Sequence, residues 1–117
     1  MGKAAAKSGK VSTGCVMIFI TTLTPESAEK ISQDLLDEKL AACANTIHGV
    51  RSLFWWKGKI DEAHESLIIC KTRQSLVKKL TKFVRERHEY EVPEIIAVPI
   101  IGGNPDYLKW VKESTVE

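Results

Sequence analysis

Apolar and polar positions follow two different periods along the first third of the chain. Residues 15–22, with the sequence CVMIFITT, form a continuous apolar and β-branched run, which is typical of a buried strand. Apolar residues then recur at helical spacing over residues 25–40. Thr24, Pro25 and Glu26 supply this helix with an N-cap, a first-turn proline and a first-turn acid. The pattern therefore predicts a strand followed by an amphipathic helix.

A long β-hairpin is predicted next. Residues 43–56 read as one strand and residues 59–72 as its partner, joined by a two-residue turn. In this register Trp55 lies beside Ile60 and shares its face of the hairpin. Gly49 interrupts the first strand, and a glycine at such a position predicts a β-bulge.

The remaining segments complete a recognisable order of elements. Residues 75–88 form a second amphipathic helix, and residues 94–100 form a further strand in which Pro99 indicates an edge position. Asn104 and the proline after it cap a short closing helix. The order βαββαβ plus a terminal helix predicts an α+β, ferredoxin-like sandwich, with residues 13–117 as a single domain.

The hairpin is longer than the sheet of one small domain requires. A fourteen-residue strand extends about 46 Å at ~3.3 Å per residue. Its outer half pairs the aromatic segment SLFWW with the polar segment DEAHE, beyond the reach of helices that cover one face of the sheet. Exposed aromatic side chains and free strand edges favour aggregation. We therefore expect Trp55 and Trp56 to contact another copy of the chain; the alternative is a local hydrophobic corner.

Charge and composition narrow the classes of partner. The 117 residues contain 17 basic and 15 acidic side chains, which gives a net charge of +2. Three lysines fall within the first ten residues, so the remainder carries about −1 and does not indicate a nucleic-acid surface. Residues 1–12 are expected to form a disordered basic tail. No apolar run approaches the ~20 residues that span a bilayer, so no membrane partner is expected.

The cysteines and glycines give little sign of catalysis. Cys15, Cys43 and Cys70 form no CxxC motif, and we expect them to be small hydrophobic residues in a reducing cytosol. Without a bulge, Cys43 and Cys70 would be diagonal neighbours on one face of the hairpin, whereas a bulge at Gly49 would separate them. No glycine-rich phosphate loop is present in the sequence. The chain is therefore expected not to be an enzyme and to need no obligatory cofactor.

The segment HEYEVPEII, residues 88–96, concentrates polar chemistry between a helix and a strand. His88 and its neighbouring glutamates offer imidazole and carboxylate ligands that suit Cu, Zn or Ni in a loose site. The alternative is a histidine that stabilises a helix C-terminus. Tyr90 and Glu94 are expected to line a cleft between subunits near Lys71 and Cys43, where strand ends converge.

Several segments together resemble the CutA divalent-cation-tolerance family. They are ACANTI (42–47), SLFWWKGKI (52–60), ESLIICKT (65–72), HEYEVPEIIAVPI (88–100) and YLKW (107–110). The resemblance covers residues 15–115. It implies a ferredoxin-like protomer in a tight homotrimer, similar in architecture to the PII signal proteins and cytoplasmic in most settings. It also implies a role in tolerance to copper and other divalent metals, without catalytic activity.

The resemblance also bears on the metal ligands. Bacterial members credited with copper binding carry a cysteine late in the first strand and a His-His pair before the Pro-Tyr segment. Here Ile20 takes the cysteine position, Arg87 and His88 take the histidine positions, and Glu89 replaces the proline. The expected function is a homotrimeric protein of metal tolerance in which His88 binds Cu²⁺ or another divalent cation. The alternative is a trimeric PII-like interaction or small-ligand-sensing module without a physiological metal site.

Overall fold

The computed structural model describes residues 12–117, so the predicted basic tail lies outside the described residues except for Ser12. The chain order of its elements is the predicted one, and the α+β, ferredoxin-like class is confirmed. The elements are β1 (Cys15–Thr22), α2 (Pro25–Asp37), β2 (Cys43–Trp56), β3 (Lys59–Arg73), the 3₁₀ turn η1 (Gln74–Leu76), α3 (Val77–Arg85), β4 (Ile95–Pro99) and α4 (Pro105–Glu113).

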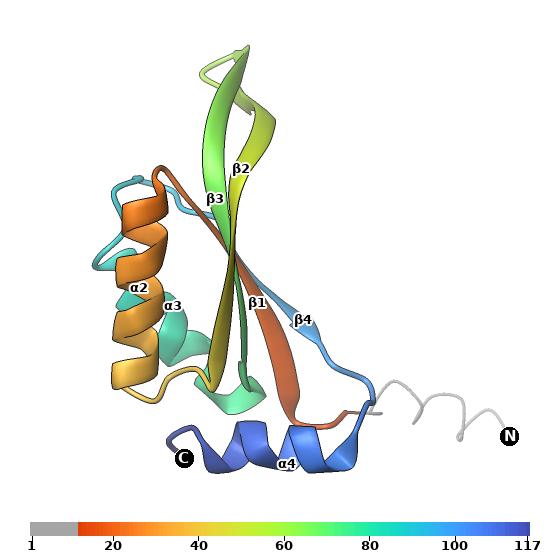
Figure 1. The fold of residues 1–117 in the computed structure, drawn as a ribbon. Helices are drawn as coiled ribbons and strands as arrows, with labels where there is room; N and C mark the ends of the chain where they lie inside the picture. The colour runs from red at the N-terminus through yellow and green to blue at the C-terminus, as the bar shows by residue number, and fades with distance from the viewer. Residues whose placement is uncertain (1–11) are drawn as a thin grey trace, which may run out of the picture.

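The four strands form one antiparallel sheet in the order β2-β3-β1-β4. Helices α2 and α3 cover one face of this sheet, and α4 crosses its lower end in the view of Figure 1. The outer part of the β2–β3 hairpin extends beyond the helices as a two-stranded arm (Figure 1). Helix α4 contacts the end of the opposite face at Cys15 and Cys43, and the rest of that face and the whole arm have no helix against them.

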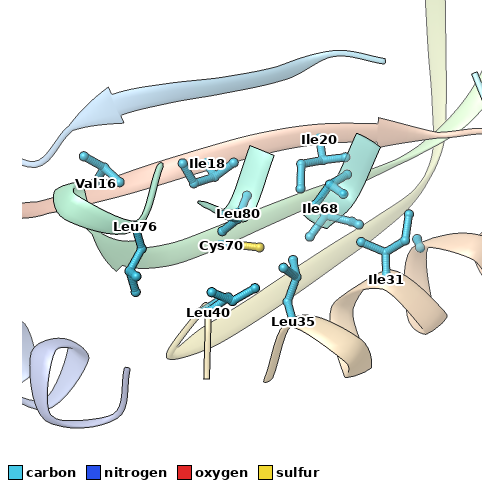
Figure 2. Close-up of a cluster of buried hydrophobic side chains, with 13 residues drawn as sticks. Val16, Ile18, Ile20, Ile31, Leu35, Leu40, Ile68, Cys70, Leu76 and Leu80 are labelled. Atoms are coloured by element: carbon cyan, nitrogen blue, oxygen red, sulfur yellow. The ribbon is translucent and has the colours of Figure 1, made fainter. Parts of the chain in front are cut away.

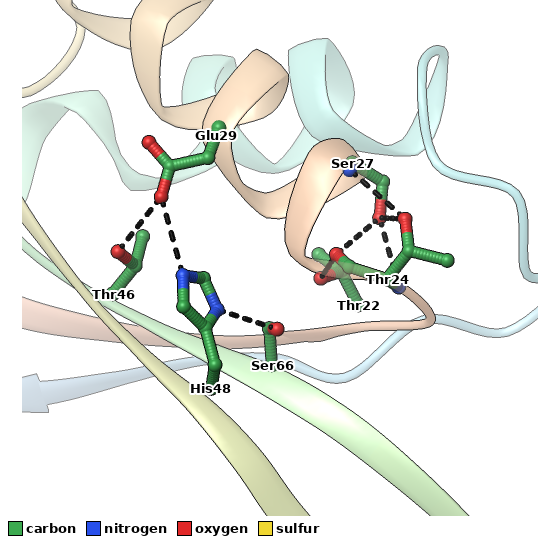
Figure 3. Close-up of polar contacts among 7 residues, drawn as sticks. All are labelled: Thr22, Thr24, Ser27, Glu29, Thr46, His48 and Ser66. Carbon is green, nitrogen blue, oxygen red and sulfur yellow. Dashed lines mark hydrogen bonds and ion pairs between the residues drawn. The ribbon is translucent and has the colours of Figure 1, made fainter.

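Helix α2 begins at the predicted residue because its cap is complete. The Thr24 Oγ1 atom accepts from the Ser27 N–H at 3.0 Å, and the Ser27 Oγ atom accepts from the Thr24 N–H at 3.2 Å (Figure 3). The helix ends at Asp37, three residues before the predicted end. Lys39 adopts a positive φ of 55°, which closes the helix, and the Leu40 N–H then bonds to the Leu35 carbonyl at 2.9 Å.

The second helix is shorter than the predicted range 75–88 at both ends. At its start the chain forms a 3₁₀ turn before α3. At its end the N–H groups of Arg87 and His88 both bond to the Val84 carbonyl, at 3.0 and 2.8 Å. The His88 ring then contacts the Thr21 carbonyl of β1, so a contact distant in sequence ends this helix.

The core lies between the sheet and the two helices α2 and α3 (Figure 2). Its fully buried side chains come from alternate positions of β1 and β3 and from one face of each helix: Ile18, Ile20, Leu35, Ile68, Cys70, Leu80 and Val84. Burial raises the pKa of the Cys70 thiol to about 12, so the sulfur remains neutral and packs as a small apolar group. Cys15 is buried as well, as predicted, whereas Cys43 is half-buried.

The predicted bulge at Gly49 is confirmed. Ile47 pairs with Leu67 and Val50 pairs with Glu65, so two residues of β2 face the single residue Ser66 of β3. Gly49 has a φ of 76°, a conformation that favours glycine. The bulge shifts the register by one residue. Cys43 consequently pairs with Lys71, and Cys43 and Cys70 face opposite sides of the sheet.

Candidate functional site

The face of the sheet opposite α2 and α3 is apolar, and beyond its end at α4 no helix covers it. Phe19 lies between Ile69 and Ile96 on neighbouring strands, and Met17 lies beside Val98 in the next row. These positions alternate with the core-facing residues of β1, so their side chains point away from the helices. Ile96 is 52% exposed, although it belongs to a strand of the sheet. We refer to these residues as the free face.

The hairpin arm exposes its aromatic residues. Trp55 pairs with Ile60 across the hairpin, as predicted, and Trp55 is 73% exposed. Trp56 is 44% exposed and has the Lys57 ammonium 5.8 Å from its ring centroid. The two tryptophans therefore do not bury one another in a local hydrophobic corner, and that alternative is wrong for the single chain.

His88 uses both of its ring nitrogens within the fold. Nε2 lies 2.7 Å from the Thr21 carbonyl, to which it donates, and Nδ1 accepts from the Tyr90 N–H at 3.0 Å. The His88 and Tyr90 rings also contact each other, with centroids 4.9 Å apart. A metal ion could bind His88 only by displacing one of these two bonds. The ring therefore ties the segment after α3 to β1, and its role as a metal ligand stays a prediction.

The other residues at or beside the family's copper positions also make contacts that belong to the fold. Ile20 is fully buried in the core. The Arg87 guanidinium lies 3.4 Å from the Phe83 ring centroid, and its Nε atom lies 3.9 Å from a carboxylate oxygen of Asp34. Glu89 accepts a hydrogen bond from the Leu23 N–H at 3.3 Å. These residues do not fit a copper site in the single chain.

Tyr90 and Glu65 form a polar contact at the end of the sheet near His88. The Tyr90 hydroxyl donates to Oε2 of Glu65 at 2.7 Å. Glu65 is only 7% exposed, so this donor satisfies a carboxylate that water scarcely reaches. Burial, followed by the hydrogen bond to Glu65, raises the pKa of Tyr90 well above its ordinary value. Tyr90 therefore remains a neutral hydrogen-bond donor across the working range of pH.

Cys43 at the start of β2 pairs with Lys71, close to the end of β3 at Arg73. The Cys43 sulfur is 3.4 Å from the Tyr107 hydroxyl, and this hydrogen bond, followed by burial, raises the pKa of Tyr107 to about 12. The Lys71 ammonium donates to the Asn45 side chain. Glu94 precedes Ile95, which lies level with Ile68 of β3, so Lys71 lies further along the sheet and two strands away. Within residues 12–117, Lys71 and Glu94 therefore form no ion pair.

The four predicted cleft residues do not meet in one chain: three of them fall into two separate groups, and Glu94 belongs to neither. Tyr90 belongs to the group at Glu65, and Cys43 and Lys71 belong to the group six residues further along β3. Glu94 is exposed just before β4 begins. Their meeting across a subunit boundary stays a prediction.

A further polar chain was missed by reasoning from the sequence. Nε2 of His48 lies 3.4 Å from Oε2 of Glu29, and Nδ1 of the same ring lies 2.8 Å from Oγ of Ser66 (Figure 3). Carboxylate, imidazole and hydroxyl follow one another here as they do in the catalytic triad of a serine hydrolase. Ser66 is only 1% exposed, however, so a substrate cannot reach its hydroxyl. The one signal in the sequence was the position of His48 directly before the bulge glycine.

The remaining cavities and clusters are less specific. A cavity of about 330 Å³ lies between α2 and α3, with both acidic and basic side chains in its wall: Lys30, Asp34, Asp37, Glu38, Phe83 and Arg87. In the part of the chain that the structure describes, three or more His, Cys, Asp or Glu side chains nowhere gather in a position to hold a metal ion. Over the same residues, each helix is too short or too polar to cross a membrane.

The amino-acid sequence is similar to a known protein family and to several of its named members. Residues 16–114 match the family model of the CutA1 divalent ion tolerance protein. The divalent-cation tolerance protein CutA of Pyrococcus horikoshii is 46% identical over 85% of this chain and 98% of its own length. The chloroplastic protein CutA 1 of Oryza sativa is 42% identical over 97% of this chain. This chain spans 64% of that rice protein and 55% of the chloroplastic CutA of Arabidopsis thaliana.

Solved structures agree with the sequence comparisons. The crystal structure of CutA1 from Oryza sativa superposes with a TM-score of 0.87 at 43% identity and covers 92% of this chain and 98% of that one. The CutA1 structure from Thermus thermophilus gives a TM-score of 0.86 at 39% identity, over 87% of this chain and 99% of that one. The chain belongs to the family of CutA1 divalent ion tolerance proteins.

Proposed function

We propose that this chain is a homotrimeric protein of divalent-cation tolerance that acts in the cytoplasm without catalytic activity or an obligatory cofactor. The observation that carries the proposal is that the single chain leaves two separate apolar surfaces in water, the free face and the arm. Ile96 of the free face is 52% exposed, and Trp55 and Ile60 of the arm are 73% and 64% exposed. Exposed apolar surfaces of this kind mark sites of protein–protein contact.

Copies of the chain are the occupants that this surface favours. The free face is a pleated apolar sheet surface, and Lys71 lies beside it as the partner of Met17. The arm is a ribbon that extends past the chain's own helices. A neighbouring chain would bury both surfaces and cover the free edges of the arm. Trp55 and Trp56 would then lie at the trimer interface. Cys43, Lys71, Tyr90 and Glu94 would line the cleft between subunits.

The metal enters as a ligand rather than a resident cofactor. Relatives of this chain are named divalent-cation tolerance proteins, which supports a role in the response to metal ions. We propose Cu²⁺ or another divalent cation as the ligand, with His88 as the first candidate position. The engaged nitrogens of His88 mean that binding there has to replace a hydrogen bond to Thr21 or Tyr90.

A second candidate function is favoured by this same observation. If the His88 ring serves only to tie α3 to β1, the trimer would be a PII-like interaction or small-ligand-sensing module without a physiological metal site.

The cytoplasmic location is likewise a proposal. Relatives include chloroplastic proteins, and one structural neighbour is the periplasmic CutA of Archaeoglobus fulgidus.

Calorimetric titration distinguishes the two functions. Purified protein is titrated with Cu²⁺, Zn²⁺ and common nucleotides, each alone, and the titrations are repeated with the variant His88→Ala. His64→Ala is the matched control, because His64 is 73% exposed on the arm. Metal binding that weakens in His88→Ala and not in His64→Ala supports the metal function at His88. Nucleotide binding with unchanged metal binding in His88→Ala favours the sensing module.

A further inference from the structure

Glu29 and His48 face each other where α2 meets the β-bulge (Figure 3). Oε2 of Glu29 lies 3.4 Å from Nε2 of His48, and the two side chains are 63% and 44% exposed. Both side chains are therefore accessible to an ion from solvent. The pair contains none of the residues at the positions of the family's copper ligands, which are Ile20, Arg87 and His88.

We propose that Glu29 and His48 bind a divalent cation of the Zn²⁺ or Cu²⁺ type through Oε2 and Nε2. Zinc binds imidazole nitrogen and carboxylate oxygen at about 2.05 and 2.1 Å, and two such atoms 3.4 Å apart subtend about 110° at the ion. This angle is that of a tetrahedral site. The ion is held without a change in the separation of its two ligands, and water completes the coordination.

The hydrogen-bond partners of His48 and Glu29 are arranged like those of the ligands in protein metal sites. A histidine that binds metal through Nε2 carries its proton on Nδ1 and donates it to a fixed acceptor. Here Oγ of Ser66 lies 2.8 Å from Nδ1, and Ser66 is 1% exposed, so the packed sheet fixes that acceptor. The Thr46 hydroxyl donates to Oε2 of Glu29 at 3.2 Å and orients the carboxylate.

An ordinary surface ion pair is the alternative, and the chain contains one for comparison. Nε2 of His64 lies 3.8 Å from Oε2 of Glu62, which corresponds to about 133° at an ion with the same bond lengths. Among the described residues, the His64 ring has no second partner like Ser66. The Glu29–His48 pair therefore has both the ligand geometry and the support that the His64–Glu62 pair lacks.

A bound ion would join α2 to β2 at the point where the arm leaves the helix layer (Figure 1). Binding to the folded chain alone raises its melting temperature, in proportion to the logarithm of the free ion concentration once the site is saturated. This proposal does not rest on the proposed function, because neither the trimer nor His88 contributes a ligand to it.

Zinc titration of four proteins tests the site. Binding of ZnCl₂ is measured by calorimetry in the parent chain, in His48→Ala and Glu29→Gln, and in the control His64→Ala. We expect the first two variants to lose at least tenfold in affinity and the control to match the parent. The zinc-induced rise in melting temperature should disappear in His48→Ala and persist in His64→Ala. Glu29→Gln alters an exposed helix position, so it reports on the site even if His48→Ala folds poorly.

Nuclear magnetic resonance of the ring nitrogens adds a readout that a purely structural histidine would not change. On addition of Zn²⁺, Nε2 of His48 should shift as a metal ligand, with the proton on Nδ1. Ser66→Ala removes the acceptor and should weaken zinc binding about tenfold. The proposal is overturned if the parent binds no zinc, if His48→Ala binds it as the parent does, or if the His48 nitrogens do not respond.

Discussion

The hydroxyl of Tyr90 should be worth more to stability than an ordinary surface hydroxyl, and Tyr90→Phe removes it alone. In the parent chain this hydroxyl donates at 2.7 Å to the side chain of Glu65, a residue that is only 7% exposed. Hydrogen bonds to charged groups contribute about 1.5–3 kcal/mol, and a buried acceptor left without a donor costs about 1–3 kcal/mol. We therefore expect Tyr90→Phe to lower the free energy of unfolding by about 2 kcal/mol.

Urea unfolding at neutral pH measures this difference, at one fixed protein concentration because assembly contributes to apparent stability. Tyr107→Phe is the matched control, since Tyr107 is 39% exposed and its hydroxyl contacts the weak acceptor Cys43. The control should change the free energy of unfolding by less than about 0.5 kcal/mol.

A double-mutant cycle with Glu65→Ala, which removes the acceptor, assigns the loss to the contact itself. If the two groups act together, the double variant should be less destabilised than the two single variants added, by about 1 kcal/mol. The reasoning is refuted if Tyr90→Phe unfolds at the same urea concentration as Tyr107→Phe. It is also refuted if the two substitutions are additive.

Three further predictions concern the cap, the buried thiol and the arm. Thr24→Ala removes the side-chain acceptor of the α2 cap and should cost about 1 kcal/mol in the free energy of unfolding, whereas Thr24→Ser should keep most of it. The folded chain holds the pKa of Cys70 at about 12, above its ordinary 9.0, so the unfolded thiol loses its proton first. The stability that depends on this thiol is complete below about pH 9 and falls as pH rises towards 12. Unfolding measured from pH 8 upward should show this decline, and a parallel decline in Cys70→Ala would contradict it. Trp55→Ala or Trp56→Ala should weaken assembly by about 2 kcal/mol or more if these side chains are interface anchors. Parent-like assembly and melting temperature in both variants would remove them from the interface.

Features of the fold that depend on a few neighbouring residues could be predicted from the sequence. The cap at Thr24 and the bulge at Gly49 depend on a few neighbouring residues, and the structure confirms both. The end of α3 could not be predicted in this way. It depends on the contact of His88 with Thr21, and these residues are distant in sequence and adjacent only after the sheet has formed.

The candidate site was predicted less completely, for a related reason. The one-residue shift at the bulge brings Lys71 onto the same face as Asn45, to which it donates a hydrogen bond. The partner of Lys71 could not be predicted from the sequence, because it depends on this shift. The Glu29–His48 pair joins a helix to a strand across two layers, at no spacing that a motif would display. Side chains that meet through tertiary packing become visible as a group only in the folded chain.

Assembly is the most direct test of the proposed function, because the free face and the arm have no other cover within the described residues. Sedimentation equilibrium of the purified protein at micromolar concentration measures it without a label or a variant. We predict a single species of about three times the chain mass of 13.1 kDa. A stable monomer of 13.1 kDa at that concentration would contradict the proposal that these surfaces are subunit interfaces.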